Sequence, residues 1–521
     1  MRHILPNGCR PEDHPRTGRR GILQAGALGL LGTGLADLLR LEAQAAGGRN
    51  TSRGPARAVI FLFQGGGPSQ HETWDPKPDA PENVRGEYRP ISTAVDGLRI
   101  CEYLPQLARR ARKYSIVRTM HHPSDPRYRN EHSAAQYLLQ TGTLALPPGE
   151  TTSTIGLPKP GRIEWPSLGS LISYAAPSDT RGGLPPSILL PRGGGDGPGQ
   201  RAGMLGARYQ TWAVNVAPQC NAPDAAGSCP TCFSHDQPDD PARQPGKGPK
   251  AWWDNSSCRN AEFRLPDLGW PAGLTVSRLE NRRALLDRVE QARRHLDEGG
   301  AARDLDVYRR QAMELLLSQN GRENPFDLSR EPDRVRERYG REEWGNAFLV
   351  ARRLVEAGVR MVQVNMRGWD THQNAFRDLK GKLLPSIDHC LSGLLDDLEE
   401  RGLLDEVVVV MGGEMGRTPV VSPITPNGLN AAGVPFTPGR HHWGDVFPFF
   451  FAGAGIAPGQ VIGRTDPTGG FPDSEAYTPA DLTATLFHLL GVGPDREFFD
   501  AEGRAYRLRQ GTPIQGLVRG A

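Results

Sequence analysis

The chain has 521 residues and a formal net charge of +3, with 63 glycines and 46 prolines. Such a nearly neutral chain lacks the clustered Lys and Arg that nucleic acid or an anionic membrane requires, so the composition argues against both partners. The length predicts one large domain with elaborations, and the glycine and proline content predicts long loops between regular elements.

The amino terminus has the features of an export signal. Arg19-Arg20 precede an apolar run over residues 22–36, and small residues in the pattern of a cleavage site follow at 43–45. This arrangement predicts a twin-arginine signal peptide over residues 1–45 and a periplasmic or cell-surface protein.

An amphipathic helix of the folded protein is the alternative for this segment, because Asp37 and Arg40 interrupt the apolar run. A polar linker is expected over residues 46–56, and the folded domain over residues 57–521. No later segment approaches the roughly 18 consecutive apolar residues of a membrane-spanning helix, so none is expected in the mature chain.

The first core element is a buried strand. Residues 58–63 form a continuous apolar run that ends in Gln64 and three glycines, which predicts a strand followed by a tight loop. A helix-like segment around residues 104–111 precedes a second apolar run at 114–118. Strand, helix and strand in this order predict a parallel sheet and an α/β fold.

Residues 176–265 are dense in Gly, Pro, Cys and Trp without a sustained period, so we expect an irregular insertion. It contains four cysteines: Cys220, Cys229, Cys232 and Cys258. Two disulfides are the favoured interpretation, because local core is scarce and export permits them. A four-thiolate zinc site and free thiols remain alternatives. Cys101 and Cys390 lie among apolar residues and are expected to pack in the core.

The second half of the chain returns to alternating helices and strands. Helices are predicted over residues 277–319, 342–357, 384–398 and 479–490, and strands over 360–366, 407–411 and 447–451.

Polar motifs stand at the ends of these strands. Asp370 and His372 follow one predicted strand, Glu414 follows the next, and His441 and His442 precede the last. Because the carboxyl ends of parallel strands meet at one edge of a sheet, we expect these side chains to face one crevice. Their oxygen and imidazole donors suit a divalent ion: zinc, manganese, calcium or magnesium. Taken singly, each carboxylate has a structural alternative as a helix cap, and each histidine as an ordinary loop residue.

Three further residues are candidates for catalysis. Ser69, in the glycine-rich loop after the first strand, is a candidate nucleophile if a base or metal lowers its proton affinity; capping a helix is its alternative role. His132, at the start of an apparent helix, is a candidate ligand or acid. Arg417 is a candidate for stabilising negative charge, or for pairing with Asp370 or Glu414.

Several strings in this order resemble the DUF1501 family: GGGPSQHETWDPKP, NEHSAAQYLLQTG, WDTHQN, GGEMGRTP and GRHHW. The resemblance extends from about residue 57 to the carboxyl terminus and includes FDLSREPDRVRERYG. It implies a distant member of the alkaline phosphatase and sulfatase superfamily, with a three-layer α/β/α sandwich, a mostly parallel sheet and a divalent-metal centre. By this resemblance Asp370 and His372 form one ligand motif, Glu414 a second and His442 a third.

The chain departs from the superfamily pattern at three places. The first strand ends in Gln64 instead of an acidic ligand, while Glu72 and His441 stand where related members often have Asp. Glu72 and His441 are therefore candidate ligands at which metal binding is retained, altered or lost. A Cys or Ser followed by x-Pro-x-Arg is missing from the sequence, which argues against a formylglycine sulfatase.

Two functional hypotheses follow. The first is an exported, metal-dependent hydrolase of phosphate or sulfate esters, with a small molecule or a polysaccharide-derived glycan ester as substrate. The second is a binding or scaffold protein that keeps the fold without the chemistry, acting on glycans or beside an exported redox partner. The missing acid after the first strand favours the second. Convergence of Ser69, Asp370, His372, Glu414 and His442 within several ångströms would favour the first, and scattered positions would argue against it.

Overall fold

The computed structural model describes residues 54–123, 129–143, 164–176, 184–190, 197–214, 275–294, 324–422, 437–500 and 502–519. The twin-arginine segment, the four clustered cysteines and the predicted helical residues 295–319 lie outside this part of the chain. All described residues belong to one compact unit, which extends from Arg53 to Ala521. None of the described helices is long and apolar enough to cross a membrane.

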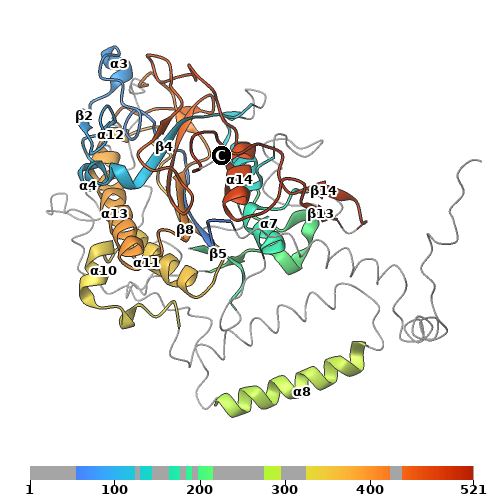
Figure 1. Cartoon of the computed structure of the whole chain (residues 1–521). Helices are drawn as coiled ribbons and strands as arrows, with labels where there is room; N and C mark the ends of the chain where they lie inside the picture. The colour runs from blue at the N-terminus through green and yellow to red at the C-terminus, as the bar shows by residue number, and fades with distance from the viewer. Residues whose placement is uncertain are drawn as a thin grey trace, which may run out of the picture. The chain divides into compact units, whose positions relative to one another are not determined.

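The described strands build a large mixed sheet in the order β12-β4-β11-β8-β1-β7-β5-β6 (Figure 1). All neighbouring pairs are parallel except those of β11, which runs antiparallel to both β4 and β8. In chain order the strands are β1 (Ala58–Gln64), β4 (Tyr114–Met120), β5 (Ser187–Leu190), β6 (Trp212–Ala213), β7 (Met361–Met366), β8 (Val407–Gly412), β11 (Phe447–Gly453) and β12 (Val461–Ile462).

Helices cover both faces of the sheet. The side chains of β1 alternate between the two faces and join a different hydrophobic cluster on each. Ile60 and Leu62 pack on one side with residues of α4 (Pro105–Arg109), α10 (Asp333–Tyr339), α11 (Glu343–Glu356) and α13 (Leu384–Glu400). Val59, Phe61 and Phe63 pack on the other side with residues of α6 (His132–Thr141), α7 (Leu168–Ala175) and α14 (Pro479–Leu489). The result is the expected three-layer α/β/α sandwich with a mostly parallel sheet.

Shorter elements decorate this frame. Three two-stranded sheets pair β2 (Pro90–Ser92) with β3 (Arg99–Cys101), β9 (Gly416–Arg417) with β10 (His442–Trp443), and β13 (Glu497–Phe499) with β14 (Ala505–Arg507). The remaining described helices are α3 (Glu82–Arg85), α8 (Val276–Arg294) and α12 (Ala375–Asp378). Short 3-10 or π segments occur at Ala111–Lys113, Gly203–Leu205, Ala207–Tyr209, Leu328–Arg330 and Leu379–Leu383.

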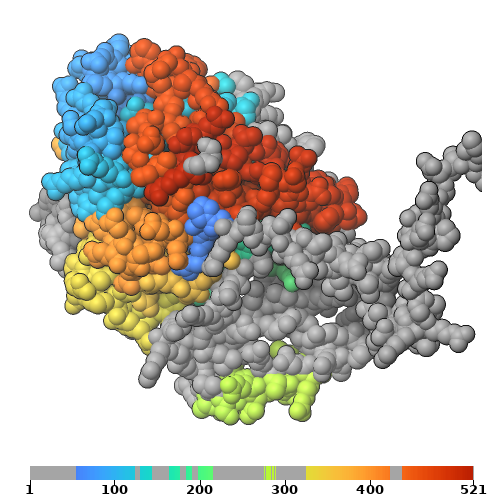
Figure 2. Space-filling view, in the orientation of Figure 1, coloured from blue at the N-terminus to red at the C-terminus, as the bar shows by residue number. Residues whose placement is uncertain are grey.

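One expectation needs correction. The region 176–265 is not wholly an irregular insertion, because β5 and β6 lie within it and extend the central sheet beside β7. The strand predicted at 114–118 is β4, which runs parallel to β1 as expected, with β8 and β11 between them. The early and late parts of the chain consequently meet on the surface, where Figure 2 shows their blue and red atoms in contact.

Cys101 and Cys390 are buried free thiols, as the sequence predicted. The carboxyl ends of β1, β7 and β8 lie side by side, and the loops that leave them carry the polar motifs.

Candidate metal centre

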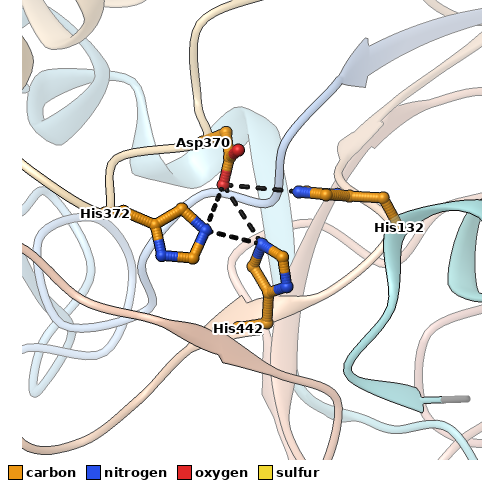
Figure 3. Close-up of side chains that lie close together, drawn as sticks. All are labelled: His132, Asp370, His372 and His442. Atoms are coloured by element: carbon orange, nitrogen blue, oxygen red, sulfur yellow. Dashed lines mark hydrogen bonds and ion pairs between the residues drawn. The ribbon is translucent and has the colours of Figure 1, made fainter.

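Four side chains from three separated segments meet at the carboxyl ends of the central strands (Figure 3). His132 begins α6, Asp370 and His372 follow β7, and His442 begins β10. Oδ1 of Asp370 lies 3.3 Å from Nε2 of His132, 3.0 Å from Nε2 of His372 and 3.2 Å from Nε2 of His442. The Nε2 atoms of His372 and His442 are 2.8 Å apart. We call these four residues the His₃Asp cluster.

The other ring nitrogen of two of these histidines faces an acceptor. Nδ1 of His442 lies 2.9 Å from the carbonyl oxygen of Asn130. Because a carbonyl oxygen only accepts, this Nδ1 donates and carries the hydrogen. Nδ1 of His132 lies 2.7 Å from Oε1 of Glu414, which accepts its hydrogen in the same way. In a neutral ring the Nε2 lone pair of each histidine then points into the cluster, as in carboxylate–histidine–metal sites.

His372 completes the pattern through its neighbour His441. The two Nδ1 atoms are 2.8 Å apart, so a hydrogen on His372 Nδ1 is accepted by His441. The Nε2 lone pairs of His372 and His442 then face each other beside the carboxylate oxygen of Asp370. In this tautomer a cation between the nitrogens would remove the repulsion of the two lone pairs, whereas in the other tautomer Nε2 of His372 donates a hydrogen bond to His442.

The donor atoms fit a divalent transition metal. Metal–ligand bonds of about 2.1 Å at octahedral or tetrahedral angles separate neighbouring donors by roughly 3.0–3.4 Å. The three separations from Asp370 Oδ1, 3.0–3.3 Å, fall in this range, and the 2.8 Å between Nε2 of His372 and of His442 is slightly shorter. The side chains are 20% exposed in His442, 34% in His372 and 46% in Asp370, so the cluster opens to solvent. Catalytic metal sites keep such access, whereas structural zinc sites are closed.

Electrostatics hold the carboxylate of Asp370 in its ionised form. Burial opposes ionisation, but hydrogen bonds from the three histidines and the charge of Arg417 outweigh it and lower the pKa of Asp370. Burial alone would lower the pKa of His132, but its hydrogen bonds to the carboxylates of Asp370 and Glu414 reverse the effect and raise the pKa to about 9. The cluster therefore attracts positive charge, whether a proton or a metal ion.

Arg417 contacts the cluster from the protein interior and is not exposed to solvent. Its side chain is fully buried, and Nη2 lies 2.5 Å from Oδ1 of Asp370. Nε also donates to the backbone carbonyl of Gly67 and Nη1 to that of Arg440, and Nη2 lies within hydrogen-bond distance of the carbonyl oxygens of Gly66 and Trp369 as well. Arg417 thus orients Asp370, and its guanidinium is already engaged by internal acceptors.

Glu414 contacts His132 but is not itself one of the four residues of the cluster. Its carboxylate accepts a hydrogen bond from the backbone N–H of Gly66 at 2.9 Å as well as from His132, and its side chain is 3% exposed. Its own carbonyl oxygen lies 2.5 Å from Nε2 of the buried His122. The arrangement makes Glu414 a partner of His132 within the structure, while the sequence had predicted a metal ligand.

Glycines let the loops that carry the cluster touch. Gly66 has φ +112°, and a Cβ there would lie 2.3 Å from the backbone nitrogen of Asp370. A Cβ on Gly439 would lie 2.3 Å from the carbonyl oxygen of His372. Side chains at either position would separate the segments that carry Asp370, His372 and His442.

Ser69 and Glu72 lie in a different contact network. Both are buried, and Ser69 Oγ donates to Oε2 of Glu72, whose carboxylate also forms an ion pair with Arg440 at 2.6 Å. Burial opposes ionisation of Glu72, but the charge and hydrogen bonds of Arg440 prevail and hold its pKa below the usual value. Neither Ser69 nor Glu72 belongs to the His₃Asp cluster.

The predicted site residues therefore separate into three groups. The structure brings His132, Asp370, His372 and His442 together. It places Glu414, His441 and Arg417 in direct contact with members of that cluster, and it pairs Ser69 and Glu72 with Arg440. Sequence reasoning missed Asn130 and Arg440, although both occur within the quoted strings NEHS and GRHHW.

The sequence profile of a family described as "Protein of unknown function (DUF1501)" matches residues 56–518. No curated protein matches the chain in sequence.

Solved structures with similar folds include three hydrolases. Similarity extends to an alkaline phosphatase from the Antarctic bacterium TAB5, with 10% identity, 84% of this chain and 99% of that chain covered, and a TM-score of 0.31. The phosphonate monoester hydrolase SpPMH from Silicibacter pomeroyi is 12% identical; the match covers 84% of this chain and 74% of that chain, with a TM-score of 0.29. The PsFucS1 sulfatase from Pseudoalteromonas sp. is 14% identical; the match covers 88% of this chain and 70% of that chain, with a TM-score of 0.30.

Proposed function

The chain belongs to the DUF1501 family, and from this premise and the geometry of the His₃Asp cluster we propose an exported, metal-dependent hydrolase of phosphate or sulfate esters. One observation carries the proposal: three imidazole Nε2 atoms converge on one carboxylate oxygen, and each ring presents its other nitrogen to a hydrogen-bonding partner. Ordinary surface histidines have no need of such an arrangement.

The donor set narrows the metal. Imidazole nitrogens suit zinc and iron better than calcium or magnesium, which prefer oxygen ligands, and manganese also favours oxygen donors such as the carboxylate of Asp370 and water in a six-coordinate shell. Four protein donors fill a tetrahedral shell, so a site that also binds substrate requires a metal that accepts five or six ligands. We therefore propose zinc with an expanded shell, or manganese. When bound, the ion supplies Lewis-acid polarisation of an ester oxygen and of a water molecule.

The side chains of the protein would bind the cation and keep its ligands in a fixed orientation. Asp370, His132, His372 and His442 would hold the cation, and Glu414 keeps the proton of His132 on Nδ1, away from the cation. Arg417 fixes the carboxylate of Asp370 from below. Together these contacts pre-organise the site before substrate arrives, which is the main contribution of a protein to electrostatic catalysis.

Water is the nucleophile in this proposal. The four ligand residues carry no hydroxyl. Ser69 is 2% exposed, and its hydroxyl donates a hydrogen bond to Glu72. If Ser69 attacked the ester, its replacement by alanine would reduce the rate about 10⁴-fold or more. We expect Ser69→Ala, assayed at saturating metal, to change kcat by less than about tenfold.

The test begins with the full chain and elemental mass spectrometry after exposure to zinc and manganese. We expect about one divalent ion per wild-type chain and a loss of binding in Asp370→Ala and His442→Ala, because each removes a ligand. Metal-loaded protein is then assayed on aryl phosphate and aryl sulfate esters.

A binding protein that keeps the fold without turnover is the second candidate. The presence of Gln64 at the end of β1, in place of an acidic residue, favours it. A metal-loaded wild type that hydrolyses neither ester class would support this candidate. A folded wild type that binds no divalent metal would contradict the proposed hydrolase.

A further inference from the structure

A buried ion pair links the first loop of the chain to the segment that carries His442. Nε of Arg440 lies 2.9 Å from Oε2 of Glu72, and Nη2 lies 2.6 Å from Oε1, so the contact is bidentate. The side chains are 1% and 2% exposed. Ser69 donates a further hydrogen bond to the Glu72 carboxylate.

Arg440 uses its remaining hydrogens on backbone carbonyls. Nη1 donates to Thr418 at 3.2 Å and to Pro419, and Nη2 donates to Val84 at 2.8 Å. With Nε and the second Nη2 hydrogen on Glu72, each of the five guanidinium hydrogens has an acceptor. Only the planar fork of arginine can satisfy this set, since a lysine offers three donors from one point.

The backbone of Arg440 lies where the segments that carry the ligands cross. Its N–H donates to the carbonyl oxygen of Thr371, between Asp370 and His372, at 3.2 Å. Its own carbonyl oxygen accepts from Arg417, whose Nη2 contacts Asp370. The position of Arg440 therefore determines how the His442 segment approaches the loop after β7.

We propose that the Glu72–Arg440 ion pair presents His442 to Asp370 and His372, so that Glu72 and Arg440 are positioning residues of the metal site. The inference rests on the proposed function, because it assumes that the His₃Asp cluster holds a metal. Glu72 then acts on the metal through Arg440 and the backbone, without coordinating it.

Glu72→Gln in the full chain is the primary test. Glutamine keeps the size of the side chain but removes the charge and one acceptor oxygen, so Arg440 loses the bidentate contact. We expect zinc affinity, measured by competition with a chelator, to fall about 10- to 100-fold, the usual effect of changing a residue behind a ligand. Arg440→Lys is expected to give a loss of the same size.

Asp397→Asn provides the matched control. Asp397 forms an equally buried ion pair with Arg352, at 2.9 Å and with side chains 4% and 1% exposed. The pair lies toward the ends of α11 and α13 that lead into β7 and β8, at the edge of the sheet opposite the cluster. We expect the zinc affinity of the folded Asp397→Asn protein to stay within about twofold of wild type, since distant sites act independently.

Hydrogen exchange of the metal-free proteins separates this inference from the proposed function. Glu72→Gln should accelerate amide exchange about tenfold in peptides that cover residues 368–376 and 437–446, and Asp397→Asn should not. If Glu72→Gln fails to fold, Ser69→Ala removes one hydrogen bond from the same carboxylate and should weaken zinc binding by about threefold.

Unchanged zinc affinity in Glu72→Gln, or a loss equal to that of Asp397→Asn, overturns the positioning role. Failure of the wild type to bind any metal overturns the proposed function instead. Faster exchange in the two named segments would then still support the anchoring of the His442 segment by Glu72 and Arg440.

Discussion

Two adjacent histidines contribute to the cluster in different ways. His442 directs Nε2 at Asp370 and donates from Nδ1 to Asn130, whereas His441 is exposed and contacts only the far nitrogen of His372 within the cluster. The first arrangement is that of a ligand and the second that of a supporting neighbour, which water can replace.

We therefore predict that His442→Ala abolishes zinc binding, while His441→Ala weakens it by about tenfold at most. Isothermal titration of both variants with zinc measures the difference, and each serves as the control for the other. Because His441 is exposed, its removal should leave the free energy of unfolding within about 0.5 kcal/mol of wild type. Complete loss of zinc binding in His441→Ala would instead make His441 a ligand.

Three of the four residues in the cluster were predictable because each follows or precedes a strand that is evident from the sequence, whereas His132 begins a helix. Asp370 and His372 come directly after an alternating run, and His442 comes just before an apolar one. The role of Glu414 was not predictable, since a carboxylate that binds a metal and one that binds the histidine beside it occupy the same place in sequence. Only the 2.7 Å contact with His132 distinguishes them.

The loop after β1 depends on a backbone conformation that few residues adopt. Gly66 has φ +112°, and its amide donates to Glu414 while the Cα lies against the backbone of Asp370. Gly97 also has a positive φ of +79°, but a Cβ there would have nothing within 4 Å. Both glycines thus have a positive φ that other residues rarely adopt, but only at Gly66 would a Cβ clash with neighbouring backbone.

Gly66→Ala should destabilise the protein by at least about 3 kcal/mol, because the strain of the positive φ adds to a clash with backbone that cannot move aside. Gly97→Ala should cost only about 1 kcal/mol. Chemical denaturation of the two variants gives these free energies, and zinc titration should show weaker binding in Gly66→Ala alone. Equal free energies for both variants would contradict the clash.

The long strands were predictable and the short ones were not, for a physical reason. β1, β7 and β8 are apolar or alternating runs of six or seven residues, because they lie in the middle of the sheet. β5 has four residues and β6 has two, within a stretch rich in Gly and Pro, so neither makes a periodic signal. The antiparallel direction of β11 is also invisible, because an apolar run has no polarity along the chain.

Export of the whole chain stays a prediction from its first 45 residues. Replacing Arg19 and Arg20 by Lys keeps the charge but should block recognition by the twin-arginine route, since that signal is read by its arginine pair. Fractionation of a Gram-negative host should then find the variant in the cytoplasm and the wild type in the periplasm. Periplasmic recovery of both would point to another route or to a structural role for the segment.

A bound metal would join parts of the fold that are far apart in sequence. The cluster takes one candidate ligand from the start of α6, two from the loop after β7 and one from β10, so an ion there would tie α6 and β10 to this loop at the sheet edge. The unfolded chain does not hold these donors together, and binding that is restricted to the folded state stabilises it by mass action.

We predict that zinc at 100 times its Kd raises the free energy of unfolding of the wild type by about 2.7 kcal/mol, and that a chelator removes this gain. His442→Ala should unfold at the same denaturant concentration with zinc or chelator, because it lacks a ligand. Asp397→Asn should be less stable than wild type in both conditions yet keep the full zinc-dependent gain, since its lost ion pair lies at the opposite edge of the sheet. A zinc-dependent gain that persists in His442→Ala would mean that the stabilising ion binds somewhere other than the His₃Asp cluster.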